Sequence, residues 1–209
     1  MVRELDSTEV KAATNVLKHA FATDPCLLHL IPDENERSYI GPALARGWLR
    51  YGIGWGKVFC TENLEGVALR RPPGAEDIHP LGAVVSGMWQ TPLLLGWAGT
   101  QRLINAGRAM DARHARAVQG PHWYCWLVAV DPAAQGGGFG GELMRHTFDL
   151  ADEQGVPCYL ETTSERALAV HLHHGYEIVE DGRIPDTDLF VWSLVRKPRT
   201  PRRVLSMAA

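Results

Sequence analysis

The chain has 209 residues, which is enough for one ordinary domain with a substantial core. Apolar residues make up 45% and charged residues 22% of the sequence, a profile that is typical of a soluble globular protein. The formal net charge is −3, which argues against broad nucleic-acid binding because proteins that grip the phosphate backbone carry an excess of Lys and Arg.

The N-terminal quarter predicts one strand followed by two helices. We expect the strand over residues 2–5 and the first helix over 8–21, for which Ser7 is a suitable N-cap. Apolar residues recur on one face of this helix at helical spacing. A second helix is expected over 34–51, although Pro42 lies inside it and removes one backbone hydrogen bond.

The middle of the chain is specified less clearly. The stretches KVFCT and GVALR around ENLE predict a β-hairpin, and residues 77–120 predict one or two loosely defined helices. Residues 78–101 contain no Asp, Glu, Lys or Arg, but Pro80 and Pro92 interrupt the apolar run that a membrane span needs. We therefore expect no membrane span, and instead a buried or substrate-covering irregular segment.

The last third alternates between strands and helices. HWYCWLVAV (122–130) predicts a long strand, because it is rich in aromatic and β-branched residues. A helix is expected over 138–154, followed by the short strand PCYLE. Ser164 is a suitable cap for a helix over 165–174, and YEIVE and DLFVWSLV predict two final strands.

No linker divides the chain, so we expect a single domain over residues 1–197 and a flexible basic tail over 198–209. The four cysteines are far apart in sequence and have no metal-ligand spacing, which favours a reduced protein in the cytoplasm. The histidines of HLHH have no nearby Cys or Asp to complete a tetrahedral set, so we expect no metal site.

One glycine-rich stretch points to a phosphate-bearing ligand. In VAVDPAAQGGGFGGEL, five of the six residues 136–141 are glycine, between a predicted strand and a predicted helix. The first N–H groups of a helix have no internal acceptor, and the helix dipole places partial positive charge there. Glycines allow phosphate oxygens to approach these groups closely.

Two cofactors fit such a loop. Gly136, Gly138 and Gly141 match the GxGxxG pattern of dinucleotide-binding folds, and Glu161 lies near the distance of their ribose-binding acid. However, residues 131–135 separate the strand from the glycines, and only one βαβ unit is evident, late in the chain. Too little sequence remains for a doubly wound sheet, which disfavours a dinucleotide-dependent oxidoreductase.

The same stretch resembles the acyl-CoA-binding core of the GCN5-related N-acetyltransferase (GNAT) superfamily. In that core, Gln/Arg-x-x-Gly-x-Gly/Ala joins a strand to a helix, and Gln135, Gly138 and Gly140 fit the pattern. The run HWYCWLVAVDPAAQGGGFGGEL, LETT and HHGYEIV most resembles the puromycin N-acetyltransferase-like branch. This resemblance is strong over about 122–196, which would form the cofactor core.

The resemblance implies an α/β fold with a mixed, mostly antiparallel central sheet, flanked by helices and splayed between strands 4 and 5. It implies that one strand pairs with the amide-bearing arm of acetyl-CoA and that the loop holds its pyrophosphate. The implied cofactor-binding residues are Val128, Ala129, Val130, Gln135, Gly136, Gly137, Gly138, Phe139 and Gly140. The family often has Arg or Lys where this chain has Gly137, and Arg145 is a candidate substitute.

The resemblance also implies two catalytic residues. Glu161 resembles the family glutamate that contacts or deprotonates the amine, directly or through water. The family tyrosine that protonates the thiolate lies four residues before a glycine, and counting back from Gly175 gives His171. His171 is therefore the acid or a ligand on the CoA side, or it is an exposed helix residue and the step is unassisted. Ala167 stands where the family has an asparagine.

The predicted function is transfer of an acetyl group from acetyl-CoA to a primary amine of a small molecule by direct attack. The alternative is a non-catalytic acyl-CoA sensor, because His171 and Ala167 stand where family side chains usually act. The expected partner is the small-molecule amine, with a homodimer as a further possibility and no nucleic-acid or membrane partner.

Overall fold

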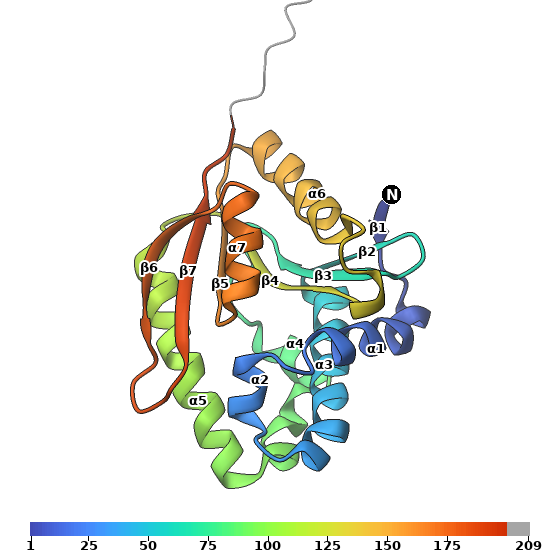
Figure 1. The fold of residues 1–209 in the computed structure, drawn as a ribbon, viewed down its shortest axis with the longest axis vertical. Coiled ribbons are helices and arrows are strands. Elements are labelled where there is room, and N and C mark those ends of the chain that lie inside the picture. The colour runs from blue at the N-terminus through green and yellow to red at the C-terminus, as the bar shows by residue number, and fades with distance from the viewer. Residues whose placement is uncertain (200–209) are drawn as a thin grey trace, which may run out of the picture.

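The computed structural model of the chain describes residues 1–199, which form a seven-stranded sheet flanked by helices (Figure 1). The strands are β1 (Val2–Glu4), β2 (Lys57–Thr61), β3 (Gly66–Arg71), β4 (Trp123–Val130), β5 (Cys158–Thr162), β6 (Glu177–Arg183) and β7 (Phe190–Arg196). The helices are α1 (Val10–Ala20), α2 (Pro25–Leu30), α3 (Glu34–Trp55), α4 (Pro80–Val85), α5 (Thr91–Ala117), α6 (Phe139–Gln154) and α7 (Glu165–His173). Short 3-10 turns are η1 (Ser7–Glu9), η2 (Met88–Gln90) and η3 (Pro132–Ala134).

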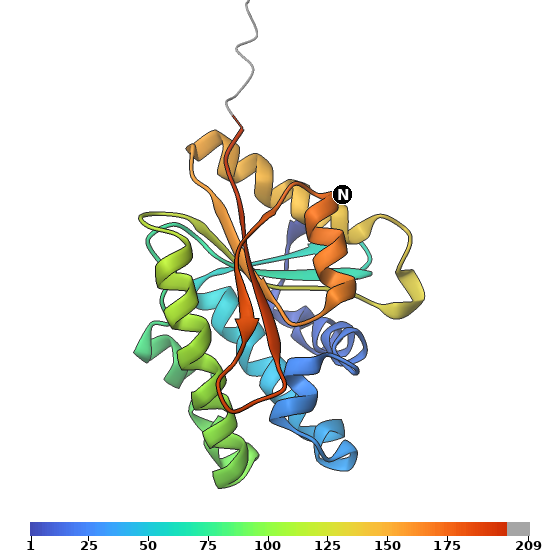
Figure 2. The ribbon, with the colours of Figure 1, turned by 60° about the vertical axis from the view of Figure 1, so that its left-hand side comes forward.

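The sheet has the order β1-β2-β3-β4-β5-β7-β6, and only the β4–β5 pair is parallel. This confirms the predicted mixed, mostly antiparallel architecture. Although β4 has eight residues, it pairs with β5 only at Trp123–Cys158 and Tyr124–Tyr159. Beyond Tyr124 the strands diverge, and β5–β7 run steeply across the direction of β1–β4 (Figure 2). The splay therefore leaves one backbone edge of β4 without a strand partner among residues 1–199.

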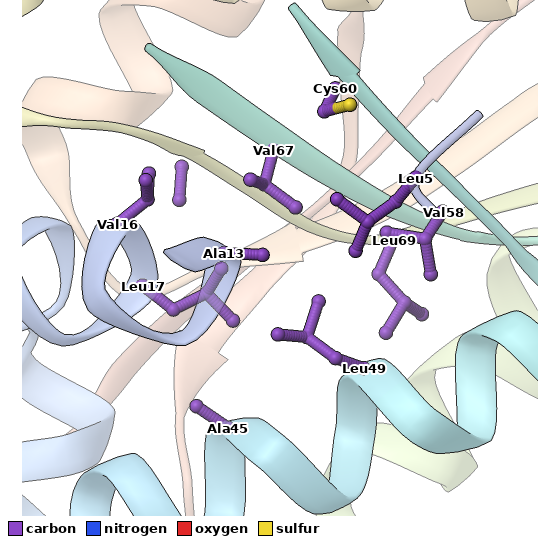
Figure 3. Packing of buried hydrophobic residues seen from close by; sticks show 11 residues of the cluster. Leu5, Ala13, Val16, Leu17, Ala45, Leu49, Val58, Cys60, Val67 and Leu69 are labelled. Carbon is purple, nitrogen blue, oxygen red and sulfur yellow. The ribbon is translucent and has the colours of Figure 1, made fainter. Parts of the chain in front are cut away.

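Helices cover both faces of the sheet and hold β3 and β4 in place. On one face, Ala13 and Leu17 of α1 and Leu49 of α3 pack against side chains of β2 and β3 (Figure 3). On the opposite face, Leu143 of α6 packs against Ala68 of β3. The apolar face predicted for the first helix is the one that is buried, because its spacing matches the helical repeat.

Local capping explains where several helices begin. Ser164 caps α7 as predicted, and its side chain accepts a hydrogen bond from the N–H of Ala167 at 3.3 Å. Helix α2 was not predicted, because TDPC looked only like a helix stop. The same residues start the next helix: the Asp24 carboxylate accepts from the N–H of Leu27 at 3.0 Å, and Pro25 occupies the first turn.

The uncharged segment 78–101 is mainly helical, so the expectation of an irregular segment was wrong. It contains α4, η2 and the start of α5, which is interrupted at Gly96, where φ is 63°. Many of its apolar side chains are exposed, including Trp97 at 81%. No helix within residues 1–199 is both long and apolar enough to cross a membrane. Most of the predicted basic tail, residues 200–209, lies outside the described residues.

Candidate functional site

A cavity of about 1520 Å³ lies where β4 and β5 diverge. Its lining includes residues of β3, β4, β5 and α7 on the sheet side, and residues of α1–α5 on the other. Glu161, His171 and Val128, which the sequence assigns to the site, all line it. The splay thus brings a predicted catalytic pair and the central strand to one cavity.

The Glu161 carboxyl lines the cavity on the β5 side and accepts two hydrogen bonds from tyrosine hydroxyls. Tyr124 Oη donates a hydrogen bond to Oε2 at 2.5 Å, and Tyr159 Oη donates to Oε1 at 2.7 Å. Tyr159 and Glu161 lie two residues apart on β5 and share a face, and Tyr124 pairs with Tyr159 across the ladder. Burial raises the pKa of Glu161 to about 7, although both tyrosine hydrogen bonds oppose the rise. The carboxyl can therefore exchange a proton near neutral pH.

Side chains from distant segments surround this carboxyl. The Arg71 guanidinium lies over the Tyr124 ring at 4.3 Å. His114 of α5 stacks on Tyr159 with a centroid separation of 4.6 Å and hydrogen-bonds His122, Nε2 to Nε2, at 2.6 Å. Burial lowers the pKa of His114 to about 4, so its ring is neutral at pH 7. Neither Arg71 nor His114 was predicted, because no local pattern links β3 or α5 to Glu161.

A pH-dependent stability follows from the raised pKa of Glu161. Its folded-state pKa of about 7 exceeds the ordinary 4.5, so the folded protein binds this proton more tightly than the unfolded chain does. The resulting stabilisation is fully present below about pH 4.5 and is lost as the pH rises to about 7. We expect Glu161→Gln to flatten this fall in the free energy of unfolding, measured by urea titration. The exposed control Glu153→Gln should keep the wild-type slope; equal slopes for all three proteins would contradict the assignment.

His171 lies on α7 and is 6% exposed, which rules out the exposed-residue alternative. Its Nδ1 is buried and has no hydrogen-bond partner among residues 1–199. Burial, followed by the charge of Arg70, lowers the pKa of His171 to about 4. The cationic form that a strong proton donor needs is therefore scarce at neutral pH, whereas the neutral ring can still donate one N–H hydrogen bond. Ala167 lines the same cavity.

The glycine loop lies at the far end of β4, outside the cavity lining, and stands away from the sheet (Figure 2). Gly136 and Gly138 have φ of +88° and +83°, a left-handed conformation that favours glycine. Their N–H groups have no acceptor among the described residues. Helix α6 begins at Phe139 without a side-chain cap. These free donors, together with the helix N-terminus, form a surface suited to an anion.

Gln135 holds the glycine loop in place and contacts Arg166, a cation that was not predicted from the sequence. Gln135 Nε2 donates to the carbonyl of Val130 at 3.2 Å, and its Oε1 accepts from Arg166 Nη2 at 2.7 Å. Arg145 instead lies along α6, close to Gly141. Arg166, in the first turn of α7, is thus a second cation near the loop, and Arg145 stays a candidate. The only sequence signal for Arg166 is the Ser164 cap, which sets where α7 begins.

The remaining predicted residues divide between backbone and core roles. Val128 and Ala129 pair with β3 on one side and have no strand partner on the other. Ala129 is buried. His122 lines the cavity, whereas Trp123 packs against α6 and donates from Nε1 to Gln154.

Comparisons with known proteins agree with this architecture. Residues 75–176 match the acetyltransferase (GNAT) family. An uncharacterised N-acetyltransferase of Schizosaccharomyces pombe (strain 972 / ATCC 24843) is 24% identical over 182 residues, which are 83% of this chain and 73% of that protein. The structure of histone acetyltransferase HPA2 and related acetyltransferase from Corynebacterium glutamicum has a TM-score of 0.66 at 24% identity, covering 97% of this chain and 98% of its own. Drosophila melanogaster polyamine N-acetyltransferase, which forms N-acetylagmatine, has a TM-score of 0.61 at 17% identity, covering 94% and 99%. The predicted fold is therefore confirmed.

Proposed function

Since residues 75–176 match the acetyltransferase (GNAT) family and the chain has the GNAT fold, we propose that it is an acetyl-CoA-dependent N-acetyltransferase. The acceptor is a primary amine of a small molecule, which attacks the acetyl group directly. The observation that carries this proposal is the Glu161 carboxyl, with a pKa of about 7, in a cavity at the open edge of β4. The structurally similar Drosophila enzyme forms N-acetylagmatine, which is consistent with a small amine as the acceptor.

The residues present fit coenzyme A at two places. The free N–H groups of Gly136 and Gly138, with the N-terminus of α6, suit its pyrophosphate. The unpartnered edge of Val128–Val130 suits its amide-bearing arm, because extended backbone pairs with amide groups as another strand would. Acetyl-CoA supplies the acetyl group as a thioester. The resemblance to the puromycin N-acetyltransferase-like branch remains a prediction.

Glu161 has the properties of a general base for the incoming amine. An ammonium group must lose a proton before its nitrogen can attack, and a base with a pKa near the working pH is efficient at this transfer. The hydroxyls of Tyr124 and Tyr159 hold the carboxylate in one orientation and stabilise its charged form. Neutral His114 adds no cationic charge beside the ammonium.

The proposal is tested by binding and turnover measured separately. Calorimetry with acetyl-CoA and with NADH distinguishes acyl-CoA binding from dinucleotide binding, and we expect heat only from acetyl-CoA. Release of free thiol with a panel of primary amines then reports transfer. Binding without turnover on any amine would favour the acyl-CoA sensor, and binding of NADH alone would overturn both proposals.

Arg166 is expected to strengthen coenzyme A binding through its charge. Because the side chain is exposed, Arg166→Met should raise the Kd only about 2- to 5-fold, and less at high salt. The matched control is Arg145→Met, which removes an exposed arginine from the neighbouring helix and should leave the Kd unchanged. Calorimetry at two salt concentrations measures both. A larger effect from Arg145→Met would show that Arg145 supplies the loop cation.

A further inference from the structure

Arg70 and Arg71 are consecutive residues of β3, and their side chains lie on opposite faces of the sheet. Arg71 lies over the rings of Tyr124 and Trp126, on the side of Glu161. Arg70 points the other way, as alternation along a strand requires, and its Nε donates to Thr147 Oγ1 of α6 at 3.0 Å. Both arginines line the cavity. The rings of Tyr124 and Trp126 stabilise the charge of Arg71. Within the described residues, the fold offers no comparable aromatic partner for the charge of Arg70.

Arg70 is a buried cation that has no carboxylate partner in the described part of the chain. It is 1% exposed, and among residues 1–199 no carboxylate lies within ion-pair distance of it. Its hydrogen bonds go only to neutral oxygens: those of Thr147, the Leu69 carbonyl at 3.2 Å and the Leu127 carbonyl at 2.5 Å. Nη2 has no hydrogen-bond partner within this part of the chain. A buried charge costs free energy unless it is paired, so an anion that arrives with a ligand would complete this site.

Two other buried arginines of the described chain, Arg113 and Arg196, each form an ion pair with a carboxylate. Arg113 forms an ion pair with Glu180 at 3.3 Å, and Arg196 forms one with Asp152 at 2.8 Å. Within residues 1–199, Arg70 and Arg71 lack such a carboxylate partner and both line the cavity. Arg71 lies over aromatic rings, whereas Arg70 contacts neutral oxygens.

Arg70 is anchored at the apex of the splay. Between the pairs Leu69–Leu127 and Arg71–Tyr124, β4 has one more residue than β3, which is a β-bulge. The pairing of β4 with β5 also ends at Tyr124. Arg70 Nη1 bonds the Leu127 carbonyl within this bulge. The guanidinium is therefore held where the strands separate.

Among the titratable groups near Arg70, the Cys125 thiol can carry opposing charge, because its interaction with Cys158 and then the charge of Arg70 lower its pKa to about 6. Its electrostatic influence reaches His171 on α7, Cys125 on β4, Cys158 on β5 and Tyr176 after α7. Tyr176 Oη donates to Cys125 Sγ at 3.2 Å. None of these groups is a carboxylate, and the Glu161 carboxyl lies on the Arg71 side of the sheet, where it accepts from Tyr124.

We propose that Arg70 stabilises the thiolate of coenzyme A as it leaves. This inference rests on the proposed function. The amine nitrogen forms a bond to the thioester carbon while the carbon–sulfur bond breaks, and the electron pair of that bond remains on sulfur. The ammonium loses its first proton to the Glu161 carboxylate, which releases that proton to water. The second proton, which the nitrogen loses as the amide forms, then passes to the same carboxylate. Arg70 offsets the charge on sulfur, and neutral His171 adds an N–H hydrogen bond, so no proton donor has to act on sulfur within the site.

The pKa of the bound thiol tests this without turnover. The thiolate absorbance of coenzyme A bound to the protein is followed against pH, and the complex with desulfo-coenzyme A is subtracted. We expect the pKa of the bound thiol to lie at least about one unit below that of the free thiol, because a nearby cation favours the charged form. Arg70→Met should abolish the shift and Arg70→Lys should retain part of it. Arg70→Gln replaces Arg70→Met if the latter does not fold.

Each outcome is decisive. An unshifted thiol in the wild type, or a shift that persists without Arg70, would overturn the proposal. A shift lost in Cys125→Ala but kept in Arg70→Met would assign the effect to the protein's own sulfur. Failure of coenzyme A to bind at all would reject the proposed function itself, and equal affinity of the variants for desulfo-coenzyme A would show that the site is intact.

The leaving group provides a kinetic check. Arg70→Met should lower kcat with acetyl-CoA about 10²-fold or more, as removal of one preorganised donor does in other enzymes. With S-(4-nitrophenyl) thioacetate the loss should be much smaller, because its more acidic thiol leaves without help. Equal losses with both donors would indicate a purely structural role for Arg70.

Discussion

Glu161→Gln is expected to lower kcat/KM for amine acetylation by about 10²- to 10⁴-fold, the usual contribution of a general base. Glutamine keeps the size of the side chain and can still accept from one tyrosine, but it cannot take a proton. The wild-type kcat/KM should rise with pH through about 7 as the carboxyl ionises. The variant should lose this limb, and thiol release measured across pH would show it.

Acetyl-CoA affinity provides the control for Glu161→Gln. The carboxyl lies in the cavity, away from the glycine loop, so the Kd measured by calorimetry should stay within about twofold of the wild-type value. Glu153→Gln, an exposed change on α6, should alter neither the Kd nor the rate. If Glu161→Gln kept the wild-type pH profile, another group would have to be the base.

Gly138→Val is expected to weaken coenzyme A binding by about 10- to 100-fold. The φ of +83° costs a residue with a Cβ about 1–2 kcal/mol, and the branched side chain would stand beside the free N–H groups at the start of α6. Loss of one hydrogen bond to a charged group adds a similar amount. The Kd for coenzyme A, measured by calorimetry, reports the result.

The two ends of α6 supply a matched control. Gly155 also has a left-handed backbone, with φ of +66°, and open space around an added Cβ, but it lies at the C-terminus of the helix. Gly155→Val should lower Tm about as much as Gly138→Val and leave the Kd unchanged. If both variants bound coenzyme A as tightly as the wild type, the loop would not be the pyrophosphate site.

The elements that the sequence predicted correctly are those with local signals. The Ser164 cap, the run of aromatic and β-branched residues in β4 and the glycines before α6 act within a few residues of themselves. Helix α2 and the region from α4 to α5 were missed or only vaguely assigned. There, proline and glycine resemble chain breaks, and contacts with distant segments decide the conformation.

The residues of the candidate site also divide into those that local sequence patterns indicate and those that only the fold brings together. The glycine loop came from a run of glycines between a predicted strand and a predicted helix, and the resemblance to the acetyltransferase family pointed to Glu161 and His171. Tertiary structure alone decided that Arg70, Arg71, His114 and Arg166 join them, and that burial moves the pKa of Glu161 up and that of His171 down. Both effects depend on which segments surround a group in space. Arg70 and His171 are 101 positions apart along the chain, and such distant residues leave no periodic trace of their proximity.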